Sequence, residues 1–424
     1  MMNIRLKIVL TSLLTALSCQ TYAVDFNLNS IFSGVFAISD NEAEYVGGIK
    51  NKPNLDGDTS AGIQLTLRGD EPGWQLTTLL LAKGEESFNL ETDTAYLTYY
   101  ASERTTVRAG RIKFPPMLAA EYIEIGFAYP WIRPPAEVYG PATLGFDTMT
   151  GIDLVYEIPF DAFTIRLQPF FGRSEFTQGV GLFPFDPTNP DAIDAIPLTD
   201  LLAVYSSAEQ AELLALDAAA ASNPGALAAA IGSGSSLAVF TALSELLGHD
   251  FDYVTAVADN MSGLNIIWSN EFSTFRLAYG RMTVPNIPDA KLTESIDGLV
   301  EYFSFAGELD WNNLISYLEI IRRNVAGDVP DLRAGYLTLG YRFGATMPHI
   351  TFAAHEPIQR GLPYVEQESI IFGVRHDLNS SVALKIETQH IRPKGGFSGS
   401  QGIFIDGTPG TDVNIFSLAV DMFF

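Results

Sequence analysis

Hydrophobic and polar residues alternate along most of this chain. In residues 61–69, AGIQLTLRG, the side chains of Ile63, Leu65 and Leu67 share one face, and polar side chains occupy the other. Alternation with a period of two is typical of a β-strand with one apolar and one polar face. It recurs in sixteen segments: FNLNSIFSGVFAI, AGIQLTLRG, WQLTTLLLAK, TAYLTYYA, TTVRAGRIK, TGIDLVYEI, FTIRLQPFFGR, SGLNIIWS, STFRLAYGR, LVEYFSFAGELDW, LISYLEIIRR, RAGYLTLGYRFG, HITFAAHE, SIIFGVRHDL, SVALKIETQHI and NIFSLAVDMFF.

This number and length of segments predict an all-β fold, a sixteen-stranded antiparallel transmembrane β-barrel. The count is even, and most segments are close to the roughly nine to eleven residues of a tilted membrane-spanning strand. Short connections such as DEPG, SER and NSS alternate with long ones such as DNEAEYVGGIKNKPNLDGDT. Outer-membrane barrels place short turns in the periplasm and long loops outside, whereas a sandwich has no reason to keep such a rule throughout.

Residues 1–23 are predicted to be a secretory signal peptide, which leaves residues 24–424 as a single barrel domain. Arg5 and Lys7 precede the apolar run IVLTSLLTAL, which is too short to span a membrane, and small or tolerated residues stand at the cleavage site before Val24. The single cysteine, Cys19, also allows a lipoprotein signal, although Ala16 stands where such signals carry leucine. No disulfide or thiol metal site is expected in the mature chain.

Composition fits a barrel better than a packed soluble core. The 424-residue chain has positive mean hydropathy and a formal charge of −25, yet after the signal it contains no uninterrupted apolar run long enough for a membrane helix. The polar faces of the segments carry charges that a packed core would not accept unpaired, whereas a water-filled lumen would. Aromatic residues near segment ends suit interfacial girdles, with a sandwich core as the alternative: Trp74, Tyr99, Tyr156, Trp268, Trp311 and Tyr341.

The final segment and the hairpin before it resemble those of Gram-negative outer-membrane porins. Val420, Met422 and Phe424 lie on the apolar face of NIFSLAVDMFF, which looks like the terminal signal that the barrel-assembly machinery recognises. SIIFGVRHDLNSSVALKIETQHI resembles a porin closing hairpin, and AGRIKFPP is also similar. The resemblance implies a trimeric, sixteen-stranded diffusion channel in the outer membrane, in contact with lipid and lipopolysaccharide.

Residues 114–148 match by position the third external loop of porins, which folds into the barrel and narrows the channel. Two proline pairs, 115–116 and 134–135, stiffen the segment, and its aromatic residues provide a surface for packing. A loop this long and apolar is usually functional. The alternative is a loop that packs only on other external loops or subunits. Its candidate constriction carboxylates are Glu121, Glu124, Glu137 and Asp147.

Basic residues on the polar faces of the segments are the expected counterpart of this loop. In the porins that the chain resembles, a basic ladder facing a carboxylate-bearing loop creates a transverse field. For each residue, a salt bridge that only supports the wall is an equal alternative. The candidates are Arg68, Arg108, Arg166, Arg276, Arg342, Arg375 and Lys385, with Asp153, Glu157, Glu319 and Glu387 on the same faces.

Residues 174–260 form an alanine-rich insert in the fourth external loop, longer than is usual for that family. SSAEQAELLALDAAAAS, in which Ser206 and Glu209 have capping-box spacing, and SSLAVFTALSELLG are predicted to be helices, with NPGALAAAIGSGSS as their linker. The helices could cover the outer mouth, enter the lumen or pack on a neighbouring subunit.

No catalytic site is expected. The five histidines are scattered, no His-Glu-x-x-His or Gly-x-Ser-x-Gly motif occurs, and no cofactor, metal or nucleic-acid partner is predicted. The function predicted is passive diffusion of ions and small hydrophilic solutes, with cations preferred because acids crowd the outer loops. The alternative is a substrate-specific transporter for a hydrophobic compound, sugar or peptide.

Overall fold

The computed structural model describes most of the chain after the predicted signal peptide. The described residues run from 24 to 424 with gaps at 70–72, 141–142, 144–146, 179–201, 203–206, 222, 236–237, 240–241, 244–253, 285–295, 328–330, 359–364, 396–401 and 407–408. Residues 1–23 lie outside this part. Among the described residues, no helix is long and apolar enough to cross a membrane.

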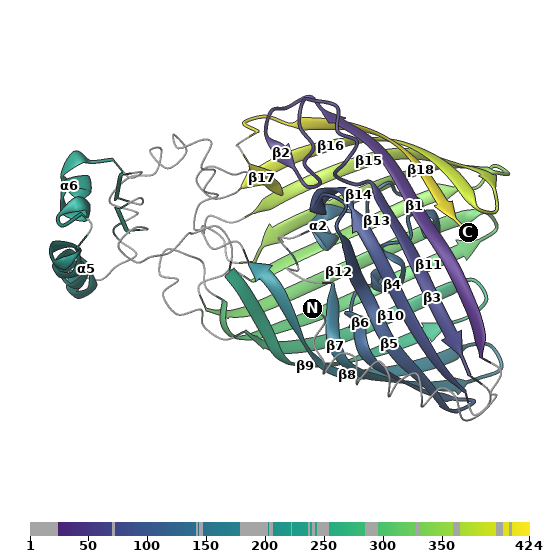
Figure 1. The fold of residues 1–424 in the computed structure, drawn as a ribbon. Helices are drawn as coiled ribbons and strands as arrows, with labels where there is room; N and C mark the ends of the chain where they lie inside the picture. Colours follow the sequence, from purple (N-terminus) through teal and green to yellow (C-terminus); the bar gives the residue numbers. More distant parts are fainter. Residues whose placement is uncertain are drawn as a thin grey trace, which may run out of the picture.

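Sixteen strands form one closed antiparallel barrel, as the alternation predicted (Figure 1). Each strand pairs with its neighbours in sequence, and β1 pairs with β18 to close the ring. The barrel strands are β1 (Asp25–Ser39), β3 (Ser60–Arg68), β4 (Trp74–Lys83), β5 (Leu90–Ser102), β6 (Thr105–Lys113), β7 (Thr148–Pro159), β8 (Thr164–Gln178), β9 (Val254–Ser269), β10 (Ser273–Val284), β11 (Ile296–Trp311), β12 (Leu314–Gly327), β13 (Leu332–Tyr341), β14 (Thr346–Pro357), β15 (Glu366–Asn379), β16 (Val382–Gly395) and β18 (Val413–Phe423).

Two short strands outside the barrel, β2 (Glu44–Tyr45) and β17 (Phe404–Asp406), pair with each other across two long loops. Around them lies a small apolar cluster that includes Tyr45, Ile49 and Ile403. The loop after β1 and the loop before β18 are therefore fastened together at the same end of the barrel.

The two faces of the strands match the predicted alternation. On β18, Phe416 and Leu418 are exposed on the outer surface, whereas Ser417 and Asp421 are buried on the inner one. Exposed apolar side chains on a barrel wall face lipid, while the inner face carries the polar groups. Five of the predicted girdle residues are exposed near the short turns: Trp74, Tyr99, Tyr156, Trp311 and Tyr341.

Phe424 takes part in closing the barrel. Its backbone N–H donates to the carbonyl of Ser30 at 2.9 Å, and the Ser30 N–H donates back to the Phe424 carbonyl at 2.7 Å. Its side chain is exposed, as are those of Phe416 and Leu418, whereas Val420 and Met422 are partly buried. All of these residues share the apolar face that the sequence pattern indicates.

The insert between β8 and β9 is shorter than residues 174–260, because β8 continues to Gln178 and β9 already begins at Val254. Helix α5 (Ser207–Ala219) lies where the first helix was predicted, and it contacts α6 (Ala226–Ser233). The linker prediction for NPGALAAAIGSGSS was wrong, because its alanine run forms α6 between Gly225 and Gly234, which both have positive φ. Ser206 and the Glu209 side chain lie outside the described residues, and only four residues of the second predicted helix are described as helical.

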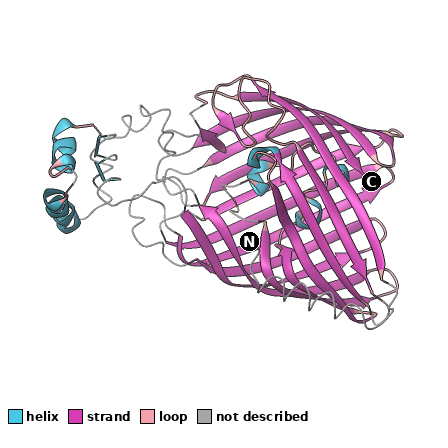
Figure 2. Cartoon of the chain, viewed as in Figure 1, coloured by secondary structure: helices cyan, strands magenta, loops and turns pink. Residues whose placement is uncertain are grey.

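The segment between β6 and β7 folds into the barrel, where Figure 2 shows its short helical turns within the ring of strands. These turns are η2 (Ala120–Tyr122), η3 (Gly126–Ala128) and α2 (Ala136–Tyr139), while η1 (Gly84–Glu86) follows β4. Helices α5 and α6 lie away from the lumen, beyond the long-loop end of the barrel (Figure 2).

Candidate pore constriction

Three basic residues of the wall hold the inward loop by its backbone. Arg276, Arg375 and Lys385 were predicted to line the passage, with a salt bridge in the wall as the equal alternative, and each donates hydrogen bonds to loop carbonyls. Buried carbonyls need donors, and cationic donors form the stronger bonds. The bonds run from Arg276 to Pro115 (3.0 Å) and Met117 (2.6 Å), from Arg375 to Phe127 (2.6 Å) and Tyr129 (3.0 Å), and from Lys385 to Gly126 (2.6 Å) and Trp131 (2.5 Å).

Two wall carboxylates complete this attachment from the acceptor side. Glu319 accepts from the Leu118 N–H at 3.0 Å and from the Tyr139 hydroxyl, and Glu387 accepts from the Ile132 N–H at 2.9 Å. Both carboxylates are buried beneath the loop. The loop is therefore fixed at both its donors and its acceptors, which makes it a rigid part of the lumen.

Trp131 fixes the loop to the β12–β14 side of the wall. Its side chain is fully buried, and its indole N–H donates to the hydroxyls of Thr338 and Thr351 at 2.9 and 3.0 Å. The rings of Tyr317 and Tyr336 lie 5.0 and 5.5 Å from it, centroid to centroid. An indole with its polar edge satisfied and its faces packed fills this side of the lumen and excludes water from it.

Glu121 and Arg108, two of the predicted constriction residues, form an ion pair between the loop and the wall. Arg108 binds Glu121 at 2.9 Å, and it also forms an ion pair with Asp153 on β7. The Arg108 side chain is only 13% exposed, whereas that of Glu121 is 41% exposed. The negative group therefore faces the lumen, and the positive group lies beneath it.

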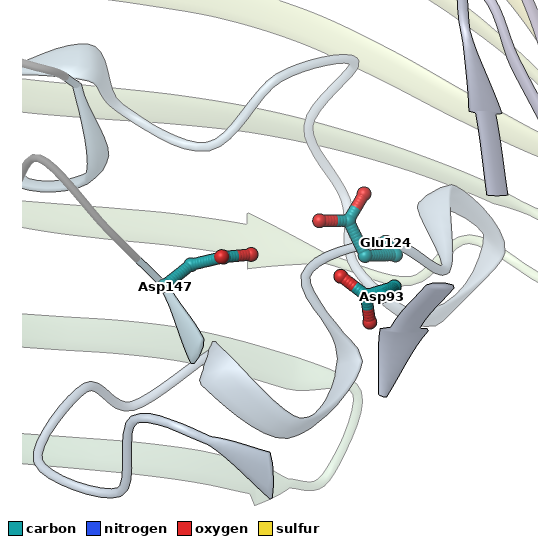
Figure 3. Close-up of side chains that lie close together, drawn as sticks. All are labelled: Asp93, Glu124 and Asp147. Atoms are coloured by element: carbon teal, nitrogen blue, oxygen red, sulfur yellow. The ribbon is translucent and has the colours of Figure 1, made fainter. Parts of the chain in front are cut away.

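A second ionic cluster surrounds Lys113, which the sequence pattern does not indicate as a constriction residue. Its ammonium lies 2.7 Å from Asp93, 3.1 Å from Glu124 and 2.6 Å from Asp147. Carboxylate oxygens of these three acids lie within 4.8 Å of one another, an arrangement that could hold a cation (Figure 3). The Lys113 ammonium fills that role, and Lys83 adds a second bond to Glu124 at 3.1 Å.

Two irregularities of the strands explain why the alternation of polar and apolar residues did not predict this cluster. Between β4 and β5 the pairing passes from Thr94 directly to Thr92, so Asp93 is an extra residue that turns inward. In β6, strict alternation from Arg108 would put Lys113 on the opposite face. Gly110 has φ +136°, and a Cβ there would lie 2.4 Å from the Ala95 carbonyl oxygen, so this twist requires glycine.

Asp147 stands at the water-facing edge of the Lys113 cluster. Burial favours its neutral form, but the charges of Lys113 and Lys83 outweigh this effect and lower its pKa below the ordinary value. Its side chain is 47% exposed, whereas that of Lys113 is 4% exposed. As with Glu121, the carboxylate is the group presented to the lumen.

Glu137 does not belong to the constriction surface. It is fully buried at the start of α2, where Gln367 donates to it at 2.7 Å. Burial raises its pKa, while the hydrogen bonds from Gln367 and Ser369 act in the opposite direction. The prediction that Glu137 faces the channel is thus corrected: its carboxyl group anchors the loop to β15.

Three of the predicted arginines lie near the short turns, and each pairs with a residue of the wall or of a turn. Arg68 contacts Tyr100, Arg166 pairs with Glu157 at 2.7 Å, and Arg342 pairs with Asp310 at 2.7 Å. The seven basic candidates therefore do not form one ladder. Arg108 alone among them pairs with a loop carboxylate, within the part of the chain that the structure describes.

Two polar cavities lie on opposite sides of the inward loop. The cavity towards the long loops has a volume of about 210 Å³ and includes Lys83, Glu124 and Arg133 in its lining. The cavity towards the short turns measures about 310 Å³ and includes Arg342, Arg375 and Asp377. Tyr129 contributes to both linings, so the segment around it separates the two spaces.

The closed sixteen-stranded antiparallel barrel is a fold of the porin type. No protein-family model and no curated protein matches the sequence. OmpF of Salmonella typhi, in a complex with daunomycin, is similar with a TM-score of 0.54 and 10% identity over 94% of this chain and 97% of that one.

Two further solved structures are similar over almost their whole length. The anion-selective porin of Comamonas acidovorans has a TM-score of 0.52 and 11% identity, covering 95% of this chain and 100% of that chain. A loop L8 deletion mutant of OmpT, an outer membrane protein of Vibrio cholerae, has a TM-score of 0.51 and 10% identity, again covering 95% and 100%. At such low identity these likenesses show the fold and do not transfer a selectivity.

Proposed function

We propose that this protein is a passive channel for ions and small hydrophilic solutes in the outer membrane, and that it prefers cations. The observation that carries the proposal is the arrangement of charge at the loop. Glu121 and Asp147 are exposed, whereas the cations that pair with them, Arg108 and Lys113, are buried behind them. A passing ion therefore meets carboxylates first.

The balance of charge points the same way. Five carboxylates meet three cations in the two clusters, which leaves an excess of negative charge: Asp93, Glu121, Glu124, Asp147 and Asp153 against Lys83, Arg108 and Lys113. In a narrow passage, charges are screened less than on an open surface. Excess acid there raises the local concentration of cations and lowers that of anions.

Size selection follows from how firmly the loop is held. Several of its carbonyls, two of its amides and its tryptophan are bonded to the wall. A loop fixed in this way does not widen for a large solute without the loss of several buried hydrogen bonds, which cost about 1–3 kcal/mol each. Small ions and solutes of a few heavy atoms are the proposed cargo.

The main alternative is a transporter for one particular small molecule. Both classes place polar groups in the lumen, but a dedicated binding site saturates, whereas a diffusion channel conducts in proportion to concentration. The proposal is for a channel and not an enzyme, because most of the described charged groups around the loop bond to its backbone or to one another. Flux measured over a wide range of solute concentration separates the two, since a plateau favours the transporter.

Assembly and partners form part of the same proposal. We expect a homotrimer in contact with outer-membrane lipid and lipopolysaccharide, inserted by the barrel-assembly machinery. The long loops would face outwards, where their acids could bind divalent ions that bridge to lipopolysaccharide.

The test is the reversal potential of single channels in a planar bilayer under a salt gradient. The variant Glu121→Gln with Asp147→Asn removes both exposed charges, yet it leaves Arg108 with Asp153 and Lys113 with Asp93. The potassium-to-chloride permeability ratio should fall roughly fivefold to tenfold near 0.1 M salt, and much less at 1 M, where the Debye length is about 3 Å.

Glu42→Gln in an outer loop is the matched control, and it should change the ratio only at low salt. An unchanged reversal potential in the double variant would contradict the proposed role of the loop. Anion preference in the unaltered protein would contradict the proposed selectivity.

A further inference from the structure

On the lipid-facing surface, two arginines stand side by side near the long-loop end of the barrel. The register places Arg322 of β12 directly opposite Arg333 of β13, and Arg322 directly opposite Phe303 of β11. Both guanidinium groups are exposed, on the same face as the apolar residues Ile320 and Leu337. They therefore project outwards from the wall and away from the lumen.

Folding alone gives no reason for this pair, because like charges directly across two strands destabilise a sheet. Arg333 has a carboxylate, Glu356, at 2.6 Å. Arg322 donates to the amide oxygen of Asn324 at 2.8 Å and forms no ion pair among the described residues. The nearest outward carboxylate on β11, Glu301, already accepts from the Tyr279 hydroxyl at 2.7 Å.

Two other basic residues at this end of the wall, Arg392 and Lys394, are neutralised locally. Arg392 lies 3.5 Å from Asp412, and Lys394 forms an ion pair with Glu368. On β10, Arg281 donates to the Ser262 hydroxyl at 3.3 Å, and the register places it directly opposite Glu301. Among the described side chains of β10–β13, three arginines (Arg281, Arg322 and Arg333) face outwards against one carboxylate, Glu301, and Glu356 of the neighbouring β14 adds a second.

An apolar groove opens directly beside Arg322. It has a volume of about 510 Å³, and Arg322 is the one charged residue of its lining, which otherwise includes Leu277, Phe305 and Ile320 from three adjacent strands. Leu277, Phe305 and Ile320 lie opposite one another on the three strands. They stand two residues closer to the short turns than the pair Phe303 and Arg322.

The pair lies at the height of a membrane interface. Tyr341 lies at the short-turn end of β13, and Arg333 lies eight residues before it on the same strand. Eight residues at about 3.3 Å each, on a strand tilted by about 40°, rise roughly 20 Å, close to the height of a lipid-facing band. Charged groups at this level meet lipid headgroups, and the groove below them meets acyl chains.

We propose that Arg322 and Arg333 form a binding site for one anionic, phosphate-bearing lipid of the membrane. The phosphate accepts hydrogen bonds from the two guanidinium groups, and an acyl chain occupies the groove lined by Leu277, Phe305 and Ile320. The bound phosphate removes the repulsion between the arginines, so the lipid also ties β12 to β13. This site is independent of the proposed channel function.

The test is native mass spectrometry of the folded barrel in neutral detergent, titrated with phosphatidylglycerol or with zwitterionic phosphatidylcholine. The unaltered protein should retain phosphatidylglycerol preferentially. Arg322→Gln with Arg333→Gln should weaken that retention roughly tenfold or more, since each arginine near an anionic surface contributes about 1 kcal/mol, or about fivefold. Arg392→Gln, at the same rim but with its own carboxylate, is the control and should bind as the unaltered protein does.

A second variant tests the groove separately from the charges. Ile320→Trp fills the groove and should weaken lipid retention while both arginines remain. The gel shift on heating checks that every variant is folded. Equal retention by the arginine variant and the unaltered protein, equal binding of both lipids, or a second copy of the chain bound in place of lipid would each overturn the site.

Discussion

Replacing Lys113 tests whether the loop is held by charge. Lys113→Met keeps the length of the side chain but removes the ammonium from between Asp93, Glu124 and Asp147. Three carboxylates whose oxygens lie within 4.8 Å of one another then lose their shared counter-ion, and Lys83 still compensates Glu124. The result is an uncompensated group of acids, two of which have largely buried side chains.

The expected loss of unfolding free energy is about 3–5 kcal/mol, the usual cost of removing one partner of a buried ion pair. A direct calculation gives the same order, because two unit charges 4.8 Å apart repel by roughly 3.5 kcal/mol at an effective dielectric constant near 20. Because Asp147 is exposed, we expect the loss of unfolding free energy to lie towards the lower end of this range. Urea unfolding in detergent, followed by the gel shift of the folded barrel, measures the change.

Three comparisons make this result specific. Lys52→Met, in an exposed loop, should leave the unfolding midpoint where it is. Adding Asp93→Asn to Lys113→Met should restore part of the lost stability, because it removes one of the repelling charges. Millimolar calcium should stabilise Lys113→Met more than the unaltered protein, since carboxylate oxygens are the ligands that calcium prefers.

The pH dependence of this difference has a defined sign. Burial raises the pKa of Asp147, but the nearby lysines outweigh this effect and lower the pKa below its ordinary value of 3.8. The stability from this contact is therefore present above that value and is lost as the pH falls through the depressed one. If the free energy of unfolding of Lys113→Met at pH 7 lay within about 1 kcal/mol of that of the unaltered protein, and Asp93→Asn restored none of the difference, the reasoning would be refuted.

Three further predictions follow from other parts of the structure. Because burial raises the pKa of Glu137, stability is lost as the pH rises through the raised value, so Glu137→Gln should raise the melting temperature at pH 8 and change it little at pH 4. Replacing Phe424 by Asp should hardly alter the stability of a folded barrel, since its side chain is exposed, but should reduce the folded barrel recovered from membranes. Cysteines at 42 or 89 should react with an impermeant thiol reagent on intact cells, whereas cysteines at 103 or 379 should not, and labelling at those turns would reverse the orientation.

Much of the barrel could be predicted because lipid outside and water inside impose a period of two on every strand. Ile63, Leu65 and Leu67 make this visible without any tertiary information, and the short turns give the direction of each strand. The strands of the wall were therefore easier to predict than the inward loop and its contacts. The alanine run of α6 was missed because a proline and several glycines around it are typical of a linker.

The candidate site was predicted less completely, for two physical reasons. Periodicity tells which face a residue occupies but not its height along the barrel, so Arg68 near a turn and Arg108 at the loop looked equivalent. Local irregularities such as the bulge at Asp93 reverse the face altogether, which hid the Lys113 cluster. Which groups bind the loop backbone, as Arg276 and Lys385 do, depends on a tertiary arrangement that a strand pattern does not encode.

The pairing of Phe424 with Ser30 has a consequence for how the protein reaches its folded state. Every other neighbouring pair of barrel strands is consecutive along the barrel sequence, but β1 and β18 are separated by almost the whole chain. Closing that distance costs the most chain entropy, so this seam should form last. The inward loop also bonds to β18 through Arg133 and Ser417 at 3.0 Å. Loop placement and ring closure are thus parts of one late step, and an unclosed intermediate would present two free strand edges with the loop still loose between them.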